Sequence, residues 1–233
     1  MEAKFYGIGV GPGESALMTL KAIDYIEKAD VLVLPAKDRE SCKAYIIAEG
    51  AYPNINKKEC IFCPFPMTMD EEALDAFHKT LSLEIIERLD KGALVGFLCI
   101  GDPDIYSTYD YIRSYIIEAG YKCETIPGVT SFNAAAALLN LSLGQKDEEI
   151  HIIPGSGDIK RALDYEGTLI FMKSGKRLAA LKELLISYEK ANPQAKVYAV
   201  SNCGLSNEKM SVGAMNIPEG KEYLTIVIVK KGV

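Results

Sequence analysis

The chain has 233 residues, of which 48% are hydrophobic and 25% are charged. These fractions are typical of a globular protein with a packed core, and they exclude disordered and collagen-like chains. Lys and Arg together number 26 against 32 for Asp and Glu, which gives a net charge of −6 at pH 7. This acidic balance argues against tight binding to nucleic acid.

Three features of the sequence indicate a cytoplasmic protein. No apolar run reaches the roughly 18 residues that a membrane span needs, so we expect no membrane association. The start, MEAKFYGIGV, lacks the basic and then apolar pattern of a signal peptide. Six cysteines are too few for a disulfide scaffold in a chain of this length, so we expect them to be reduced thiols.

The first half of the chain alternates predicted strands and helices. Lys4–Val10 is a short β-rich segment that ends at Gly11-Pro12-Gly13, and the helical spacing of Leu17, Leu20, Ile23 and Ile26 predicts a helix after it. Further strands are expected over 31–34 and 93–100, and further helices over 41–48, 71–89 and 106–118. Such alternation is typical of a parallel sheet.

The second half contains more strands than helices. Strands are expected over 122–126, 149–153, 168–172, 196–201, 209–214 and 223–229, and helices over 131–139 and 178–190. Because no helix separates the last two strands, we expect a hairpin-like antiparallel end to a mixed sheet. The sequence therefore predicts an α/β fold of two lobes, residues 1–120 and 121–233, with a mostly parallel sheet in the first and a mixed sheet in the second.

Several predicted strands end in turns that are rich in glycine or small polar residues. These turns are Gly9-Val10-Gly11-Pro12-Gly13, Gly101-Asp102-Pro103, Pro127-Gly128-Val129-Thr130-Ser131 and Ser201-Asn202-Cys203-Gly204. Turn formation alone explains any one of them, but ligands of open α/β sheets bind beyond the carboxyl ends of the strands. Four such turns together favour a ligand site.

The first of these turns does not match the dinucleotide fingerprint G-x-G-x-x-G, because Pro12 or Glu14 falls where the third glycine should be. Pro12 also lacks the backbone N–H that a phosphate-binding loop needs, and Glu14 adds a negative charge. This turn therefore favours a ligand without phosphates.

Asp102, Thr130 and Ser131 each allow two interpretations. Asp102 suits the N-cap of the following helix, and its carboxylate also suits a cationic cofactor. Thr130 and Ser131 suit the N-cap of a helix that starts at Phe132, or contacts to a ligand.

Other candidate sites are weaker. Cys60-x-x-Cys63 has no second pair of ligands, so no metal site is predicted. His78 and His151 have no partner acid and nucleophile nearby in the sequence, which argues against a triad hydrolase. Core packing is the favoured explanation for the aromatic residues Tyr106, Tyr109 and Tyr111 near one helix start.

Taken together, the Gly-Val-Gly-Pro-Gly turn, Ala29-Asp30-Val31, Gly101-Asp102-Pro103 and the 127–131 turn resemble the tetrapyrrole (class III) S-adenosylmethionine-dependent methyltransferases, in order and spacing over nearly the whole chain. Within that family, Phe65-Pro66-Met67-Thr68 and the segment 101–108 are similar to the C20-methyltransferases that act on precorrin-2 or cobalt-factor II in cobalamin biosynthesis.

The resemblance implies that S-adenosylmethionine is held in a cleft between two lobes, that a tetrapyrrole is the substrate, and that the protein is a homodimer. Family positions that match this chain place cofactor contacts at Pro12, Ile100, Gly101, Asp102, Ile105, Thr130, Ser131, Met172, Asn202, Cys203 and Thr225. They place substrate contacts at Pro66, Met67 and Tyr106.

The resemblance identifies no catalytic base. Uroporphyrinogen methyltransferases of the family carry an aspartate just after the second strand, where this chain has Leu34-Pro35-Ala36-Lys37. An electron-rich meso carbon needs only alignment with the methyl group. Three alternatives stay open: methylation of another tetrapyrrole carbon, action on a diphthamide precursor or ribosomal RNA, and a tetrapyrrole-binding protein without catalysis.

Overall fold

The computed structural model describes residues 3–66, 68, 70–219 and 224–232. The chain forms two compact units, Met1–Thr130 and Ser131–Val233. The division falls after Thr130 and not after residue 120 as predicted, because strand β5 (Lys122–Ile126) pairs with β1 (Lys4–Gly9) and so belongs to the first unit. None of the helices in these residues has the length and apolar character to span a membrane.

The first unit contains a five-stranded sheet in the order β3-β2-β4-β1-β5, in which every neighbouring pair is parallel. Its remaining strands and its helices are β2 (Val31–Leu34), β3 (Glu59–Phe62), β4 (Leu94–Cys99), α1 (Leu20–Lys28), α2 (Lys43–Ala51), α3 (Glu71–Asp90) and α4 (Tyr109–Glu118). The predicted parallel sheet is confirmed. All five strands point the same way, so their carboxyl ends lie along one edge.

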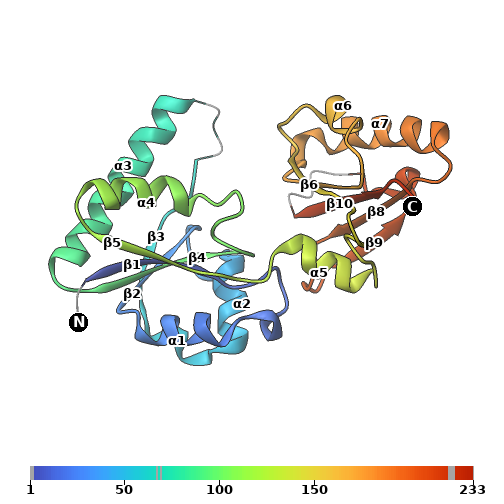
Figure 1. Cartoon of the computed structure of the whole chain (residues 1–233). Helices are drawn as coiled ribbons and strands as arrows, with labels where there is room; N and C mark the ends of the chain where they lie inside the picture. Colours follow the sequence, from blue (N-terminus) through green and yellow to red (C-terminus); the bar gives the residue numbers. More distant parts are fainter. Residues whose placement is uncertain (1–2, 67, 69, 220–223, 233) are drawn as a thin grey trace. The chain divides into compact units, whose positions relative to one another are not determined.

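The helices of the first unit cover the two faces of its sheet, with α1 and α2 on one face and α3 and α4 on the other (Figure 1). Leu81, Ile85 and Leu89 of α3 and Ile112 and Ile116 of α4 are buried against the strands. These side chains recur every three or four residues, as a helix that covers a sheet requires. Apolar strands with both faces covered explain why β1, β2 and β4 are almost continuously hydrophobic.

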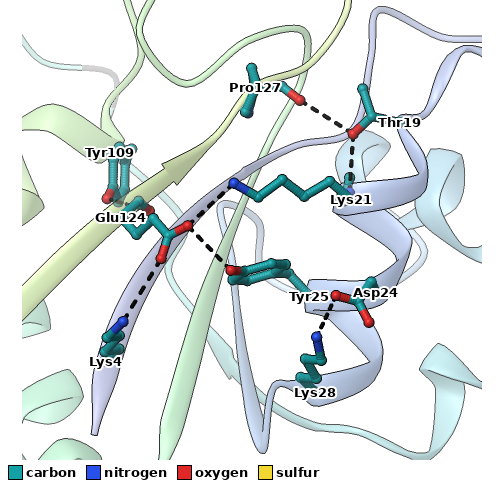
Figure 2. Close-up of polar contacts among 10 residues, drawn as sticks. Lys4, Thr19, Lys21, Asp24, Tyr25, Lys28, Tyr109, Glu124 and Pro127 are labelled. Carbon is teal, nitrogen blue, oxygen red and sulfur yellow. Dashed lines mark hydrogen bonds and ion pairs between the residues drawn. The ribbon is translucent and has the colours of Figure 1, made fainter. Parts of the chain in front are cut away.

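Polar contacts hold helix α1 against β5, as Figure 2 shows. Glu124 of β5 accepts a hydrogen bond from the Tyr25 hydroxyl at 3.2 Å and forms an ion pair with Lys21 at 3.3 Å. The Thr19 side chain accepts the N–H of Ala22 at 3.0 Å and so caps the start of α1. α1 therefore begins after Thr19, and Leu20, whose spacing helped to predict the helix, is 86% exposed.

The second unit contains a mixed five-stranded sheet in the order β6-β7-β10-β8-β9. Its elements are α5 (Ser131–Leu138), β6 (Ile150–Pro154), α6 (Ile159–Ala162), β7 (Thr168–Met172), α7 (Leu178–Ala191), β8 (Lys196–Ser201), β9 (Lys209–Val212) and β10 (Thr225–Lys230). The antiparallel end of the sheet is confirmed, but the pairing is not. β9 pairs with β8, and β10 lies between β7 and β8, so the last two strands are not neighbours.

Two short elements were missed from the sequence. β3 is an edge strand of four residues in which only Ile61 is fully buried, so it lacks a hydrophobic run. α6 is a single turn that depends on Asp158, whose side chain accepts the N–H of Arg161 at 3.1 Å. Four residues are too few to produce a helical pattern in the sequence.

One face of the second sheet is covered by α6 and α7, and α5 covers the other (Figure 1). Leu178, Leu181 and Leu185 of α7 are buried against Phe171 and Val227 of the sheet. Outside this core, an ion pair fixes the end of β10. The Lys230 ammonium donates to Glu148 at 2.5 Å and to the Thr168 hydroxyl at 2.7 Å.

We expect the Glu148→Gln substitution to lower the free energy of unfolding at pH 7 by about 1–2 kcal/mol, the contribution of a charge-assisted hydrogen bond. Burial raises the pKa of Glu148, but the Lys230 and Thr168 bonds outweigh this and lower it below its usual 4.5. A depressed carboxyl pKa stabilises the folded state above the unfolded pKa, and this gain is lost as the pH falls through the folded pKa.

The measurement is urea unfolding of both proteins between pH 7 and pH 3. The difference between them should begin to shrink as the pH falls below the usual carboxyl pKa of 4.5, and it should disappear only below the lowered pKa of folded Glu148. Glu219→Gln is the control, because Glu219 pairs with Lys182 while 89% exposed and should change little. A difference for Glu148→Gln that persists unchanged at pH 3 would contradict the role of the charge.

Candidate functional site

Three turns meet closely at the carboxyl edge of the first sheet. The N–H of Gly11 donates to Gly101 O at 3.3 Å and that of Gly101 donates to Gly11 O at 2.7 Å, so the turns after β1 and β4 form a bridge. A Cβ atom built on Gly128 would lie 2.1 Å from Gly101 O, and one on Gly9 would lie 2.6 Å from the Gly128 nitrogen. Only glycine permits this approach of the turns after β1, β4 and β5.

Asp102 joins two of these turns. Its Oδ2 accepts the N–H of Gly128 at 2.9 Å, and its Oδ1 accepts the N–H of Asp104 at 2.8 Å. Of the two interpretations of Asp102, the helix cap does not hold, because α4 begins at Tyr109 with Thr108 as its N-cap; the cofactor contact stays a prediction. The carboxylate is half-buried, so it stabilises the edge and still reaches solvent.

Gly11, Gly101 and Gly128 use their N–H groups in these internal bonds, and Pro12 has none. These four positions therefore leave no backbone donor for a phosphate group. The arrangement agrees with the interpretation that this edge takes a ligand without phosphates.

The segment between Asp102 and α4 carries two further candidate residues, Ile105 and Tyr106. The N–H of Ile105 bonds back to Asp102 O at 3.3 Å, which closes a turn. Tyr106 has φ = 51° and a side chain that is 42% exposed. A bulky residue in the left-handed region is costly, and such strain is concentrated at functional sites.

The first unit thus brings Pro12, Ile100, Gly101, Asp102 and Ile105 to one edge, while Thr130 ends this unit and Ser131 begins α5 of the other. The hydroxyl of Thr130 is buried and makes no hydrogen bond within the described chain, so it does not cap α5.

The second unit brings Met172, Asn202, Cys203 and Thr225 to one edge of its own sheet. Met172 ends β7, and the neighbouring β10 begins at Thr225 opposite Ser201, the last residue of β8. The hydroxyls of Ser201 and Thr225 bond at 2.8 Å.

Asn202 and Ser174 lie just beyond strands of this edge. Asn202 follows β8 with φ = 53°, a left-handed conformation that asparagine tolerates. Ser174 follows Met172 by two residues, and its hydroxyl is buried and makes no hydrogen bond within the described residues. The sequence does not single out Ser174, since a serine after a strand is also typical of an ordinary turn.

The predicted substrate segment is described only in part. Met67 lies outside the described residues, whereas Pro66 lies in the connection from β3 to α3. Phe65 packs against Phe97 and Phe77, with ring centroids 6.3 and 5.1 Å away. Phe65 therefore serves the core of the first unit and holds Pro66 beside it.

The tyrosines divide into two groups. Tyr109 is fully buried, as core packing predicts, whereas Tyr106 and Tyr111 are 42% and 61% exposed. Tyr111 stacks on His78. The Nε2 atom of His151 lies 3.0 Å from a carboxylate oxygen of Glu149.

The cysteines are free thiols, as expected. Burial raises the pKa of Cys99 to about 12 and that of Cys123 to about 11, so both stay protonated at neutral pH. No group of three or more His, Cys, Asp or Glu side chains suited to a metal ion occurs in the part of the chain that the structure describes.

Comparison with known proteins identifies the family. The model of the tetrapyrrole (corrin/porphyrin) methylases matches residues 4–216, a stretch that includes the first sheet edge and, at the second, Met172, Asn202 and Cys203 but not Thr225. The chain belongs to the tetrapyrrole methylase family. The resemblance inferred from the turns is therefore confirmed.

Two relatives in this family match almost the full chain. A Methanocaldococcus jannaschii protein named as a probable cobalt-precorrin-2 C(20)-methyltransferase is 32% identical, over 98% of this chain and 96% of its own length. The precorrin-2 C(20)-methyltransferase of a Sinorhizobium species is 27% identical, over 97% of this chain and 94% of its own.

Solved structures of tetrapyrrole methylases have the same fold. A cobalt precorrin-4 methyltransferase has a TM-score of 0.77 at 20% identity, over 97% of this chain and 94% of that one. A uroporphyrin-III C-methyltransferase from Thermus thermophilus, complexed with S-adenosylhomocysteine, has a TM-score of 0.70 at 19% identity, over 98% of both chains.

We expect the Asp102→Asn substitution to lower the free energy of unfolding by about 1–3 kcal/mol. An asparagine side chain offers one acceptor oxygen, so the N–H of either Gly128 or Asp104 loses its partner. Chemical denaturation measures the change. Asp104→Asn is the matched control, because Asp104 is exposed and keeps an oxygen for the Thr125 hydroxyl. Equal stability of the two variants would contradict the joining role of Asp102.

Proposed function

We propose that this protein transfers a methyl group from S-adenosylmethionine to C20 of precorrin-2 or cobalt-factor II in cobalamin biosynthesis. The observation that carries the proposal is that relatives named as C20-methyltransferases match almost the whole chain, both sheet edges included. The chain also has Leu34-Pro35-Ala36-Lys37 where the uroporphyrinogen methyltransferases of the family carry an aspartate just after the second strand.

The residues at the two sheet edges suit S-adenosylmethionine, which is a sulfonium cation with an apolar adenine and no phosphate. The N–H groups of Gly11, Gly101 and Gly128 already donate hydrogen bonds within the protein. The first edge therefore suits a ligand without phosphates. The unbonded hydroxyls of Thr130 and Ser174 are donors that lack a partner in the described chain, as expected where a ligand completes the bonding.

Each candidate residue has a role in this proposal. Asp102 supplies a carboxylate within one of the three turns, and its two bonds to backbone N–H groups fix its orientation. Ile105 and Met172 supply apolar contact for the adenine, and Met172 is 7% exposed. Pro12, Ile100, Gly101, Ser131, Asn202, Cys203 and Thr225 complete the proposed cofactor contacts.

The protein contributes mainly alignment to the reaction. When bound, S-adenosylmethionine supplies an electrophilic methyl group. A carbon–carbon bond forms at C20 while the carbon–sulfur bond breaks, and the C20 proton then leaves as the substrate regains its conjugation. Displacement needs the carbon about 3–3.5 Å from the methyl group and in line with sulfur. Pro66, Met67 and Tyr106 are proposed to fix the substrate's rotation and so decide which carbon reacts.

The test is anaerobic incubation with methyl-labelled cofactor and both metallated and metal-free substrates. We expect one methyl group per molecule, which carbon-13 NMR places at C20, with release of S-adenosylhomocysteine and no need for an added metal. Calorimetry with S-adenosylhomocysteine checks the cofactor separately. A label at another carbon would contradict the C20 assignment. Absence of transfer despite cofactor binding would favour a non-catalytic tetrapyrrole-binding protein.

We also propose that the protein is a homodimer, as its family resemblance implies. Met210 and Val212 of the edge strand β9 are 54% and 59% exposed, and Met215 beside it is 61% exposed. Apolar side chains of this size on an open edge are typical of an interface. Light scattering should give about twice the 25.5 kDa of one chain. A mass near 25.5 kDa at micromolar concentration would contradict the dimer.

A further inference from the structure

Tyr111 is an exposed aromatic residue whose orientation is nevertheless fixed. Its side chain is 61% exposed, and its ring lies almost parallel to that of His78, with centroids 5.0 Å apart and an angle of 9° between the planes. One face of the Tyr111 ring is covered by the imidazole, and the exposed area belongs to the rest of the ring. His78 itself is only 8% exposed, so the inner ring of this stacked pair is buried.

The His78 ring is in turn held in place by a series of aromatic contacts that begins in the core. Phe97 of β4 is 1% exposed and lies 6.3 Å from Phe65, whose ring lies 5.9 Å from that of His78. Phe77 also packs on Phe65 at 5.1 Å. Each ring limits the movement of the next, so the position of Tyr111 depends on the sheet itself.

The series ends at the carboxyl edge of the first sheet. Tyr111 lies in the first turn of α4, directly after the segment that carries Asp102 and Tyr106. Phe65 directly precedes Pro66, a proposed substrate contact. The two segments follow the carboxyl ends of β3 and β4, which lie on either side of β2 in the same parallel sheet, so both belong to the edge already described.

The physical properties of the stack suit a flat, uncharged ring. Burial lowers the pKa of His78 and outweighs the opposing effect of Asp75, so the imidazole is neutral at neutral pH. A rigid aromatic face loses little conformational entropy when a second ring covers it. Aromatic stacking also tolerates a pyrrole-derived ring without any hydrogen bond.

Resting on the proposed function, we infer that the exposed part of the Tyr111 ring contacts a pyrrole-derived ring of the tetrapyrrole substrate and that His78 positions Tyr111 for this contact. Tyr111 is then a specificity residue, and His78 is a positioning residue that does not touch the substrate. Neither residue was assigned a role by the sequence, which favoured core packing for the tyrosines near this helix start.

The first experiment compares Tyr111→Ala, Tyr111→Phe and the control Ile117→Ala. Ile117 lies on the same helix and is 50% exposed, but it is near the other end of α4. We expect Tyr111→Ala to raise the KM for the tetrapyrrole about tenfold, the loss of one aromatic stacking contact. Tyr111→Phe and Ile117→Ala should stay within about twofold of the unchanged protein. The affinity for S-adenosylhomocysteine should not change in any variant.

The second experiment tests the positioning role with His78→Ala and His78→Phe. His78→Ala should raise the same KM without changing cofactor affinity, and His78→Phe should restore it, because phenylalanine keeps the stack. Melting temperatures identify any variant that fails to fold, and Tyr111→Ala alone then decides. An unchanged KM for folded Tyr111→Ala, or an equal rise for Ile117→Ala, would overturn the inference.

Equilibrium binding of the metal-free substrate, followed by its absorption, separates this inference from the proposed function. If the unchanged protein binds the tetrapyrrole without methylating C20, the proposed function fails. Weaker binding by Tyr111→Ala would still support the contact. If C20 is methylated and Tyr111→Ala binds the tetrapyrrole as the unchanged protein does, only the inference fails.

Discussion

No side chain fits at Gly9 or Gly128, and this steric constraint determines how the turns at the carboxyl edge of the first sheet are arranged. The turns after β1, β4 and β5 approach so closely that a Cβ atom on Gly128 would lie 2.1 Å from a backbone oxygen. This approach places Asp102 within reach of the Gly128 N–H. It also uses up the backbone donors that a phosphate site would require, so one steric constraint sets both the geometry and the chemistry of the edge.

The second unit reaches a comparable edge by a different route. Its sheet is mixed, and the ends of β7 and β8 lie beside the beginning of β10, where Thr225 pairs with Ser201 through their hydroxyls. Here the two strands are joined by side chains and by the Asn202 N–H, which donates to Leu224 O at 2.8 Å. Asn202 in the left-handed conformation ends the ladder and turns the chain away from the sheet.

Long apolar segments and glycine-rich turns made most of this fold predictable. Val31–Leu34 and Thr168–Met172 were located at their observed bounds, because a buried strand between turn residues has few alternatives. The pairing of β9 and β10 was wrong because adjacency in the sequence does not reveal that β10 inserts between β7 and β8. Of the two interpretations of Asp102, the helix cap does not hold, and its contact with Gly128, 26 residues away, was not visible in the sequence. The turns were identified, but their contacts depend on tertiary approach that no local pattern contains.

The strand order of the first sheet has a consequence for how the protein is made. β1 lies between β4 and β5, and Lys4 pairs with Leu94 on one side and Lys122 on the other. At a synthesis rate of about 5–20 residues per second, the first strand waits several seconds for both of its neighbours. Until then its apolar residues have no sheet to join, and unpaired apolar strands are prone to aggregation. β1 is thus completed as part of the sheet only after nearly all of its unit has emerged from the ribosome.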